Sequence, residues 1–197
     1  MRLIKYSTQF IAISFLLILF RILGFKIASN LSFKIFTYLG PLFRSKNLIK
    51  ENIIKAYPNI NDKDLKQIIN NMWGNYGRIL SEYVFIKNFR NSKLSDNIKI
   101  KGQEILDRIK KDNKPVIFIS GHFNNFELMA MHIEKSGLDV AAIYRPLNNK
   151  FLNFFMERIR KKFICKHQIK KGISGTKKIL NHFKNGTSIA LMIDQRL

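Results

Sequence analysis

The clearest pattern along the chain is an apolar stripe at helical spacing between residues 62 and 83. Apolar residues that recur every three or four positions form one face of a helix. Pro58 interrupts the mixed helical pattern of residues 31–57, and Asn61 followed by Asp62 is typical of a helix start. We therefore predict a long helix that packs through its stripe, which consists of Leu65, Ile68, Ile69, Met72, Trp73, Tyr76, Leu80 and Tyr83.

The N-terminal segment is mostly apolar. Only Arg21 is charged between Ser7 and Phe25, and this run nearly reaches the length of about 20 residues that a bilayer span requires. Three interpretations stay open: a transmembrane anchor, a helix in the membrane interface, and a signal peptide, although no small-x-small cleavage site follows. We expect residues 1–28 to attach the protein to a membrane. Basic residues between 26 and 46 favour the cytoplasmic side for the bulk of the protein.

After residue 95 the pattern changes to short apolar runs that alternate with amphipathic segments. The predicted strands are NIKIKG (97–102), KPVIFIS (114–120), DVAAIY (139–144) and TSIALMID (187–194), and the apolar ones are expected to be buried on both faces. The predicted helices are QEILDRIKKDN (103–113), NFELMAMHIEKSG (125–137), NNKFLNFFMERIRKKF (148–163) and GISGTKKILNHFKNG (172–186). This alternation predicts an α/β fold with a mostly parallel sheet covered by helices.

The sequence thus divides into three parts. We expect a membrane anchor or interfacial helix in residues 1–28, a helical N-terminal region in residues 29–95, and an α/β core in residues 96–197. Because the last apolar strand is followed only by QRL, the sheet lacks a closing helix. We therefore expect the α/β core to be C-terminally incomplete.

Polar residues follow three of the predicted strands. They are Ser120-Gly121-His122, Tyr144-Arg145-Pro146 and Asp194-Gln195-Arg196. Ligands of parallel α/β sheets bind at the carboxyl ends of the strands. Together these clusters therefore predict a site along one edge of the sheet.

His122 and Glu127 are the residues in this region with the most obvious chemistry. Five positions on one helix would separate them by roughly 140°, so they can meet only if His122 precedes the helix and Glu127 lies in its first turn. A carboxylate that orients an imidazole gives a general base, which can deprotonate a hydroxyl group. The alternative is a helix-capping histidine, with Glu127 placed favourably at the helix dipole.

Composition narrows the function further. The formal net charge is +22, which suits an anionic partner such as a membrane surface, an acidic protein or nucleic acid, although AT-rich codon usage would also enrich lysine. The single cysteine, Cys165, excludes an internal disulfide and indicates a reducing compartment. Nucleophile-elbow, dinucleotide-binding, Walker A and zinc-binding motifs are missing from the sequence, so neither a cofactor nor a metal ion is expected.

The stretch ISGHFNNFELM resembles the His-x-x-x-x-Glu block of the bacterial lipid A biosynthesis acyltransferases. These belong to the broader lysophospholipid and glycerol-phosphate acyltransferases, where aspartate usually replaces the glutamate. The sequence typical of the lipid A branch is G-H-F-G-N-W-E. This chain matches it except at Asn124 and Phe126, where glycine and tryptophan are usual. YRPLNNKFLNFFMERIR, ALMIDQ and the region around the Pro58 break are also similar to blocks of that family, in the same order.

The resemblance implies transfer of an acyl chain from an acyl carrier protein thioester to a hydroxyl of a lipid A precursor at the bacterial inner membrane. It implies His122 as general base and Glu127 as the residue that orients it. Arg145 would bind a phosphate, a carboxylate or the developing oxyanion. Asn125, Asp194 and Gln195 would contribute to the substrate site. The fold is then expected to be of the glycerol-phosphate acyltransferase type, with no cofactor.

Three alternatives remain at this stage. One is an acyltransferase of the same superfamily that acts on another glycolipid or a lysophospholipid. Another is a truncated and inactive membrane protein. The third is a basic nucleic-acid-binding protein, against which stand the dispersed basic residues and the absence of a recognisable binding motif in the sequence.

Overall fold

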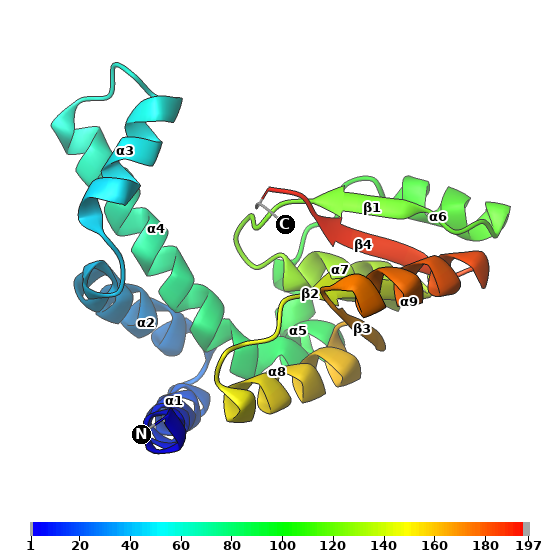
Figure 1. Ribbon diagram of the computed structural model, residues 1–197, viewed down its shortest axis with the longest axis horizontal. Coiled ribbons are helices and arrows are strands. Elements are labelled where there is room, and N and C mark those ends of the chain that lie inside the picture. The colour runs from blue at the N-terminus through cyan, green and yellow to red at the C-terminus, as the bar shows by residue number, and fades with distance from the viewer. Residues whose placement is uncertain (1, 195–197) are drawn as a thin grey trace. The chain divides into compact units, whose positions relative to one another are not determined.

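The computed structural model describes residues 2–194, which form two compact units (Figure 1). One unit is Ser14–Phe85 and is entirely helical. The other combines the N-terminal residues up to Ile13 with the chain from Ile86 onward, and it contains a parallel sheet. The predicted α/β fold with a helical N-terminal region is therefore confirmed.

Helix α1 (Arg2–Leu23) opens the chain, and its two halves belong to different units. Its 22 residues are long and apolar enough to cross a bilayer, since about 20 residues suffice. Its buried side chains are Leu17 and Phe20, so most of its apolar surface is exposed. A membrane anchor and a signal sequence share this length and composition.

The helical unit continues with α2 (Phe25–Leu39), a 3-10 turn (Gly40–Leu42), α3 (Lys46–Ala56), α4 (Asp62–Glu82) and a second 3-10 turn (Tyr83–Phe85). As predicted, Asn61 caps α4, because its Oδ1 accepts a hydrogen bond from the Asp64 backbone N at 2.9 Å. Helices α2 and α4 form the main contact of this unit. At their contact the Ser32 hydroxyl donates to the Gly77 carbonyl at 2.6 Å.

The α/β unit contains four parallel strands in the order β1-β4-β2-β3. The strands are β1 (Ile117–Ser120), β2 (Val140–Tyr144), β3 (His167–Lys170) and β4 (Ser188–Met192). The last strand in the chain is thus central, pairing with β1 through Ile117↔Ile189 and with β2 through Ala142↔Ala190. The helices of this unit are α5 (Ile86–Asn91), α6 (Gln103–Asp112), α7 (Glu127–Lys135), α8 (Lys150–Phe163) and α9 (Ile173–Lys184), with a 3-10 turn at Lys93–Asn97.

Both faces of the sheet are covered by helices, with α9 on one face and α6 and α7 on the other (Figure 1). Beneath α9 lie Ala141, Ile169 and Ile189. On the opposite face, Ile133 of α7 packs with Val140 and the buried Cys165. This double coverage explains the continuous apolar runs of the central strands.

Two predictions about the strands are wrong, and one strand was not predicted. Residues 97–102 form no strand, because the extended segment has no pairing partner among the described residues and Ile100 is exposed. Strand β1 is not buried on both faces: Ile117 is 53% and Ile119 is 62% exposed, as fits an edge strand. Strand β3 was not predicted, since the short sequence HQIK has little apolar content.

Candidate active site

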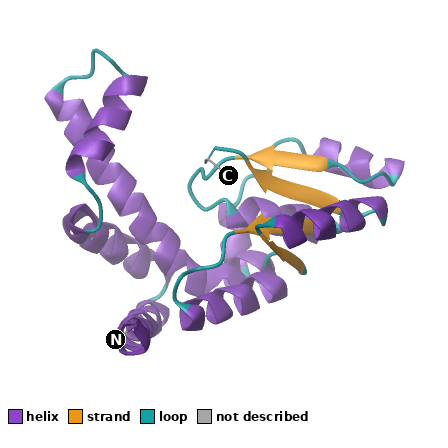
Figure 2. Cartoon of the chain, viewed as in Figure 1, coloured by secondary structure: helices purple, strands orange, loops and turns teal. Residues whose placement is uncertain are grey.

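His122 lies in the loop between β1 and α7, outside the helix as the spacing predicted. Its backbone N donates to Asp194 Oδ2 at 2.8 Å, and its ring Nδ1 is 2.8 Å from Asp194 Oδ1. The ring also meets the Phe126 ring edge-on, with 4.9 Å between centroids. The loops after β1 and β4 lie together at this end of the sheet (Figure 2), so neighbouring parallel strands bring the two residues into contact.

Asp194 determines which nitrogen of His122 is available for chemistry. A carboxylate accepts hydrogen bonds, so Nδ1 carries the proton and donates it, which leaves Nε2 as the basic nitrogen. Hydrogen bonds from the His122 backbone N–H and then from its ring hold the pKa of Asp194 below its ordinary value. Asp194 therefore stays ionised near neutral pH and places a negative charge against the His122 ring.

Gly121 makes this contact possible by leaving space. A Cβ atom at this position would lie 2.9 Å from the Phe123 ring and 3.3 Å from Asp194 Cγ. The positive φ in this loop instead belongs to Asn124, at 45°. Asparagine adopts the left-handed region more readily than other non-glycine residues, so it fills the position where the family usually has glycine.

Glu127 is the first residue of α7 and is buried, at 5% exposure. Its Oε1 accepts hydrogen bonds from Arg160 of α8, with a distance of 2.8 Å to Nε and a second, shorter contact to Nη2. The carboxylate on the His122 ring is therefore that of Asp194, and Glu127 lies against Arg160. The catalytic role predicted for Glu127 stays a prediction.

Asp194 and Arg160 are thus the partners that sequence reasoning did not assign. In the sheet β4 lies next to β1, and the order of the strands along the chain does not predict that these two are neighbours. Arg160 lies within a basic run together with Lys161 and Lys162, which are exposed. The only available signal was that Arg160 lies on the inner side of the amphipathic helix.

A cavity of about 500 Å³ opens beside His122 within the α/β unit. Its polar lining includes His122, Arg145, Lys171 and the Glu127–Arg160 pair, so Arg145 and Lys171 give it a net positive charge. Apolar side chains line the rest, among them Met129, Ile143, Ile164, Ile179 and Leu191. A basic region next to an apolar one suits a ligand with an anionic part and a hydrocarbon part.

Tyr144 closes one side of this cavity at the end of β2. Its hydroxyl donates to Glu157 Oε1 of α8 in a short hydrogen bond. Burial, and then the hydrogen bond to Glu157, raise the pKa of Tyr144 well above its ordinary value. The phenol therefore stays protonated and acts as a fixed link between β2 and α8.

The remaining predicted site residues are Arg145, Asn125 and Gln195. Arg145, at the end of β2, is exposed and lines the same cavity as His122. Asn125 is half-buried in the loop before α7, where its carbonyl accepts from the Leu128 backbone N at 3.1 Å. Gln195 lies outside the described residues. Within residues 2–194, no cluster of three or more His, Cys, Asp or Glu side chains is arranged to hold a metal ion.

These features define an α/β protein with a histidine–aspartate site beside a largely apolar cavity that basic side chains also line. Over residues 1–197 the sequence matches the family described as bacterial lipid A biosynthesis acyltransferase. The chain therefore belongs to that family, which confirms the resemblance seen in the sequence. It is also similar to the protein named lipid A biosynthesis acyltransferase 2 of Shigella flexneri, with 24% identity over 131 residues. That match covers 66% of this chain and 42% of the relative's length.

Proposed function

We propose that the protein transfers a fatty acyl group from an acyl carrier protein thioester to a hydroxyl group of a lipid A precursor. The observation that carries the proposal is the basic nitrogen of His122, held by Asp194 beside a largely apolar cavity that Arg145 and Lys171 also line. Membership of the lipid A acyltransferase family supports this substrate class.

In this mechanism His122 Nε2 accepts the proton of the acceptor hydroxyl as its oxygen attacks the thioester carbonyl. The tetrahedral intermediate carries a negative charge, which Arg145 at the cavity wall stabilises. The carbon–sulfur bond then breaks, and the departing thiolate takes the proton from His122. Asp194 stays ionised throughout and stabilises the imidazolium.

Glu127 supports the site by holding the Arg160 side chain in place. Its carboxylate lies against Arg160, which lines the cavity with His122. We assign to this pair the positioning of α7, and with it the loop that carries His122, against α8. An orienting effect of Glu127 on His122 therefore acts through the loop backbone and through Arg160.

The apolar part of the cavity takes the acyl chain, and the basic part takes an anionic group of the donor or acceptor. The net charge of +22 suits an acidic carrier protein and an anionic lipid. Residues 1–28 attach the protein to the inner membrane, with residues 29–95 and the α/β core of residues 96–197 on the cytoplasmic side. Asn125 and Gln195 contribute to the substrate site.

The test is an acyl-transfer assay with membranes that contain the protein. Acyl carrier protein thioesters and a tetra-acylated lipid A precursor are supplied, and the product mass is followed. Transfer should occur with the wild-type chain and disappear in His122→Ala. The matched control is His132→Ala on α7, because His132 interacts with Gln103 and does not line the cavity.

Transfer that survives in His122→Ala would refute the proposed mechanism. Supplying another glycolipid or a lysophospholipid as acceptor decides between lipid A precursors and the other substrates of the superfamily. Absence of transfer to every acceptor by the wild-type chain would refute the proposed activity of this chain.

A further inference from the structure

The outward side of α8 carries an aromatic and basic stripe that the proposed chemistry does not use. We call it the α8 outer stripe, and it consists of Phe151, Phe154, Phe155, Arg158, Lys161 and Lys162. These residues are spaced by three, four and seven positions, so they lie on one side of the helix. The aromatic half comes first along the helix, and the basic half occupies its last two turns.

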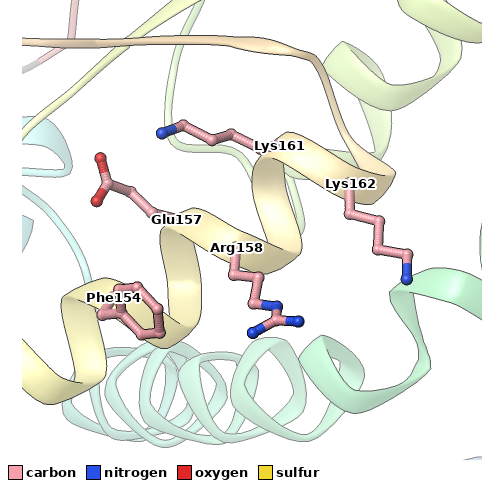
Figure 3. A pocket seen from close by; sticks show the side chains of 5 residues that line it. All are labelled: Phe154, Glu157, Arg158, Lys161 and Lys162. Carbon is pink, nitrogen blue, oxygen red and sulfur yellow. The ribbon is translucent and has the colours of Figure 1, made fainter.

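The stripe is exposed. Phe154 is 67%, Phe151 is 42% and Phe155 is 36% exposed. Figure 3 shows Phe154 and Arg158 projecting from one side of α8, with Lys162 one turn further along on that side. The basic residues also line a surface hollow of about 400 Å³ with Phe154 and Glu157. Within the described residues, none of the three basic side chains forms an ion pair.

Other residues of α8 are already committed to the site. Glu157 accepts the hydrogen bond of Tyr144, and Arg160 donates to Glu127. Asn153 donates to Glu157 at 3.4 Å and accepts from the Leu147 backbone N at 2.9 Å. The helix therefore cannot turn its phenylalanines inward without breaking these contacts.

The aromatic half of the stripe continues the apolar surface of α1. Phe10 of α1 and Phe151 pack with ring centroids 5.7 Å apart. The buried amide of Asn149 joins the two helices, since its Nδ2 donates to the Tyr6 carbonyl at 2.8 Å while its Oδ1 caps α8 by accepting from the Phe151 backbone N at 3.1 Å. A buried amide with this many hydrogen-bond partners holds α1 and α8 in one arrangement.

We propose that the α8 outer stripe is a second membrane contact, which docks on an anionic phospholipid surface. Phe154 and Phe155 enter the boundary between headgroups and acyl chains, and Arg158, Lys161 and Lys162 bind headgroup phosphates. Aromatic residues followed by basic ones on one helix face are the pattern of helices that lie in a membrane interface.

A lipid surface fits this face better than an acidic protein does. Adjacent exposed phenylalanines form an apolar patch, which is unusual on a surface that faces water. This patch adjoins α1, which has the length and composition of a membrane helix. An acidic partner would account for the three basic residues only. The inference concerns attachment and is measured without turnover, so it does not depend on the proposed acyl transfer.

The consequence is a fixed orientation of the site. Because the stripe contacts lipid and other residues of α8 hold Glu127 and Tyr144, docking of the stripe sets the distance between the cavity and the bilayer surface. A lipid acceptor could then reach the cavity from the membrane surface.

The test measures the depth of α8 in vesicles with the full chain. Phe154→Cys and Phe155→Cys are labelled with an environment-sensitive fluorophore and reconstituted in phosphatidylcholine, with and without phosphatidylglycerol. Cys165 is 1% exposed, and burial raises the pKa of its thiol to about 12, so it should stay unlabelled. Ile11→Cys on α1 is the positive control, and Leu180→Cys, exposed on α9, is the negative control.

In vesicles with phosphatidylglycerol, labels at 154 and 155 should shift to the blue and be quenched by lipid-borne quenchers, as the label at 11 is. The triple variant Arg158→Gln/Lys161→Gln/Lys162→Gln should weaken this docking by roughly 10- to 100-fold, with the spectrum of the label returning towards the aqueous one. Circular dichroism verifies that each variant is folded.

Two results would overturn the inference. In the first, labels at 154 and 155 behave as the label at 180 does in both vesicle types, while the label at 11 is inserted. In the second, the labels are shielded only after addition of an acidic acyl carrier protein, which would make the stripe a protein-docking surface instead.

Discussion

The interiors of the helical unit and of the α/β unit are built in opposite ways. Between α2 and α4 there is no space for an added atom: a Cβ on Gly77 would lie 2.3 Å from the Ser32 carbonyl oxygen. The α/β unit keeps a cavity of about 500 Å³ and buries a charged pair, Glu127 with Arg160. Dense packing of small residues favours a fixed scaffold, whereas open space and internal charge are what chemistry on a ligand needs. Variants can therefore be designed to affect one unit without the other.

The largest effect is expected for His122→Ala on activity. Loss of a general base typically lowers the rate by about 10²- to 10⁴-fold. The side chain of His122 is 36% exposed, so its removal should leave the fold intact. The assay compares the rate of acyl transfer with amide hydrogen exchange in both units, and altered exchange throughout the α/β unit would contradict a purely chemical role.

The next largest effect is expected for Glu127→Ala on stability. This change leaves the Arg160 guanidinium buried without its carboxylate, and breaking a buried pair in this way costs about 3–5 kcal/mol. Hydrogen exchange should become faster in β1, β2 and α7 and stay unchanged in α2 and α4. The double variant Glu127→Leu/Arg160→Met should recover most of this loss. Failure of the double variant to recover protection would argue against the pair as the cause.

Gly77→Ala should lower the stability of the helical unit and leave the α/β unit unchanged. The new Cβ would collide with the Ser32 backbone, so α2 and α4 must separate, at a cost of about 1–3 kcal/mol. The single tryptophan, Trp73, lies in α4, and its fluorescence reports unfolding of this unit alone. Asn71→Ala, at an exposed position of the same helix, is the matched control and should not lower the unfolding midpoint.

Ser32→Ala tests the same contact from the other helix, with a smaller expected effect. It removes the hydrogen bond to the Gly77 carbonyl and should destabilise the helical unit by about 1 kcal/mol. The measurement is again the Trp73 fluorescence midpoint in denaturant. An effect as large as that of Gly77→Ala would mean that the hydrogen bond, and not close packing, holds α2 against α4.

The smallest expected effect is the pH dependence of the His122–Asp194 pairing in the α/β unit. The pKa of Asp194 is lowered in the folded protein, so the unfolded chain binds its proton first as pH falls. The pairing with His122 should therefore be fully present above the ordinary aspartate value of 3.8 and be lost only as pH falls through the lower, folded pKa. A carbon-13 NMR titration of the Asp194 carboxyl measures this. A midpoint at or above 3.8 would contradict the hydrogen-bonded geometry.

Sequence reasoning succeeded where one residue pattern decides one local structure. The apolar stripe and the Asn61 cap predicted α4, and the five-residue spacing correctly placed His122 before α7 and Glu127 at its start. It failed where the outcome depends on neighbours in space. The partner of His122 follows from the insertion of β4 beside β1, and the exposure of Ile119 follows from the position of β1 at the sheet edge. Neither relation is contained in local periodicity.

The central position of β4 also has a consequence for synthesis of the protein. Strand β1 pairs with β4 and with no other described strand, and His122 is separated from Asp194 by 72 residues. During translation β1 therefore emerges from the ribosome long before β4, and both of its edges stay unpaired until then. Contacts of such long sequence separation form late and slowly. The helical unit, Ser14–Phe85, is complete before β4 is synthesised, so it can fold while His122 still lacks the carboxylate that orients it.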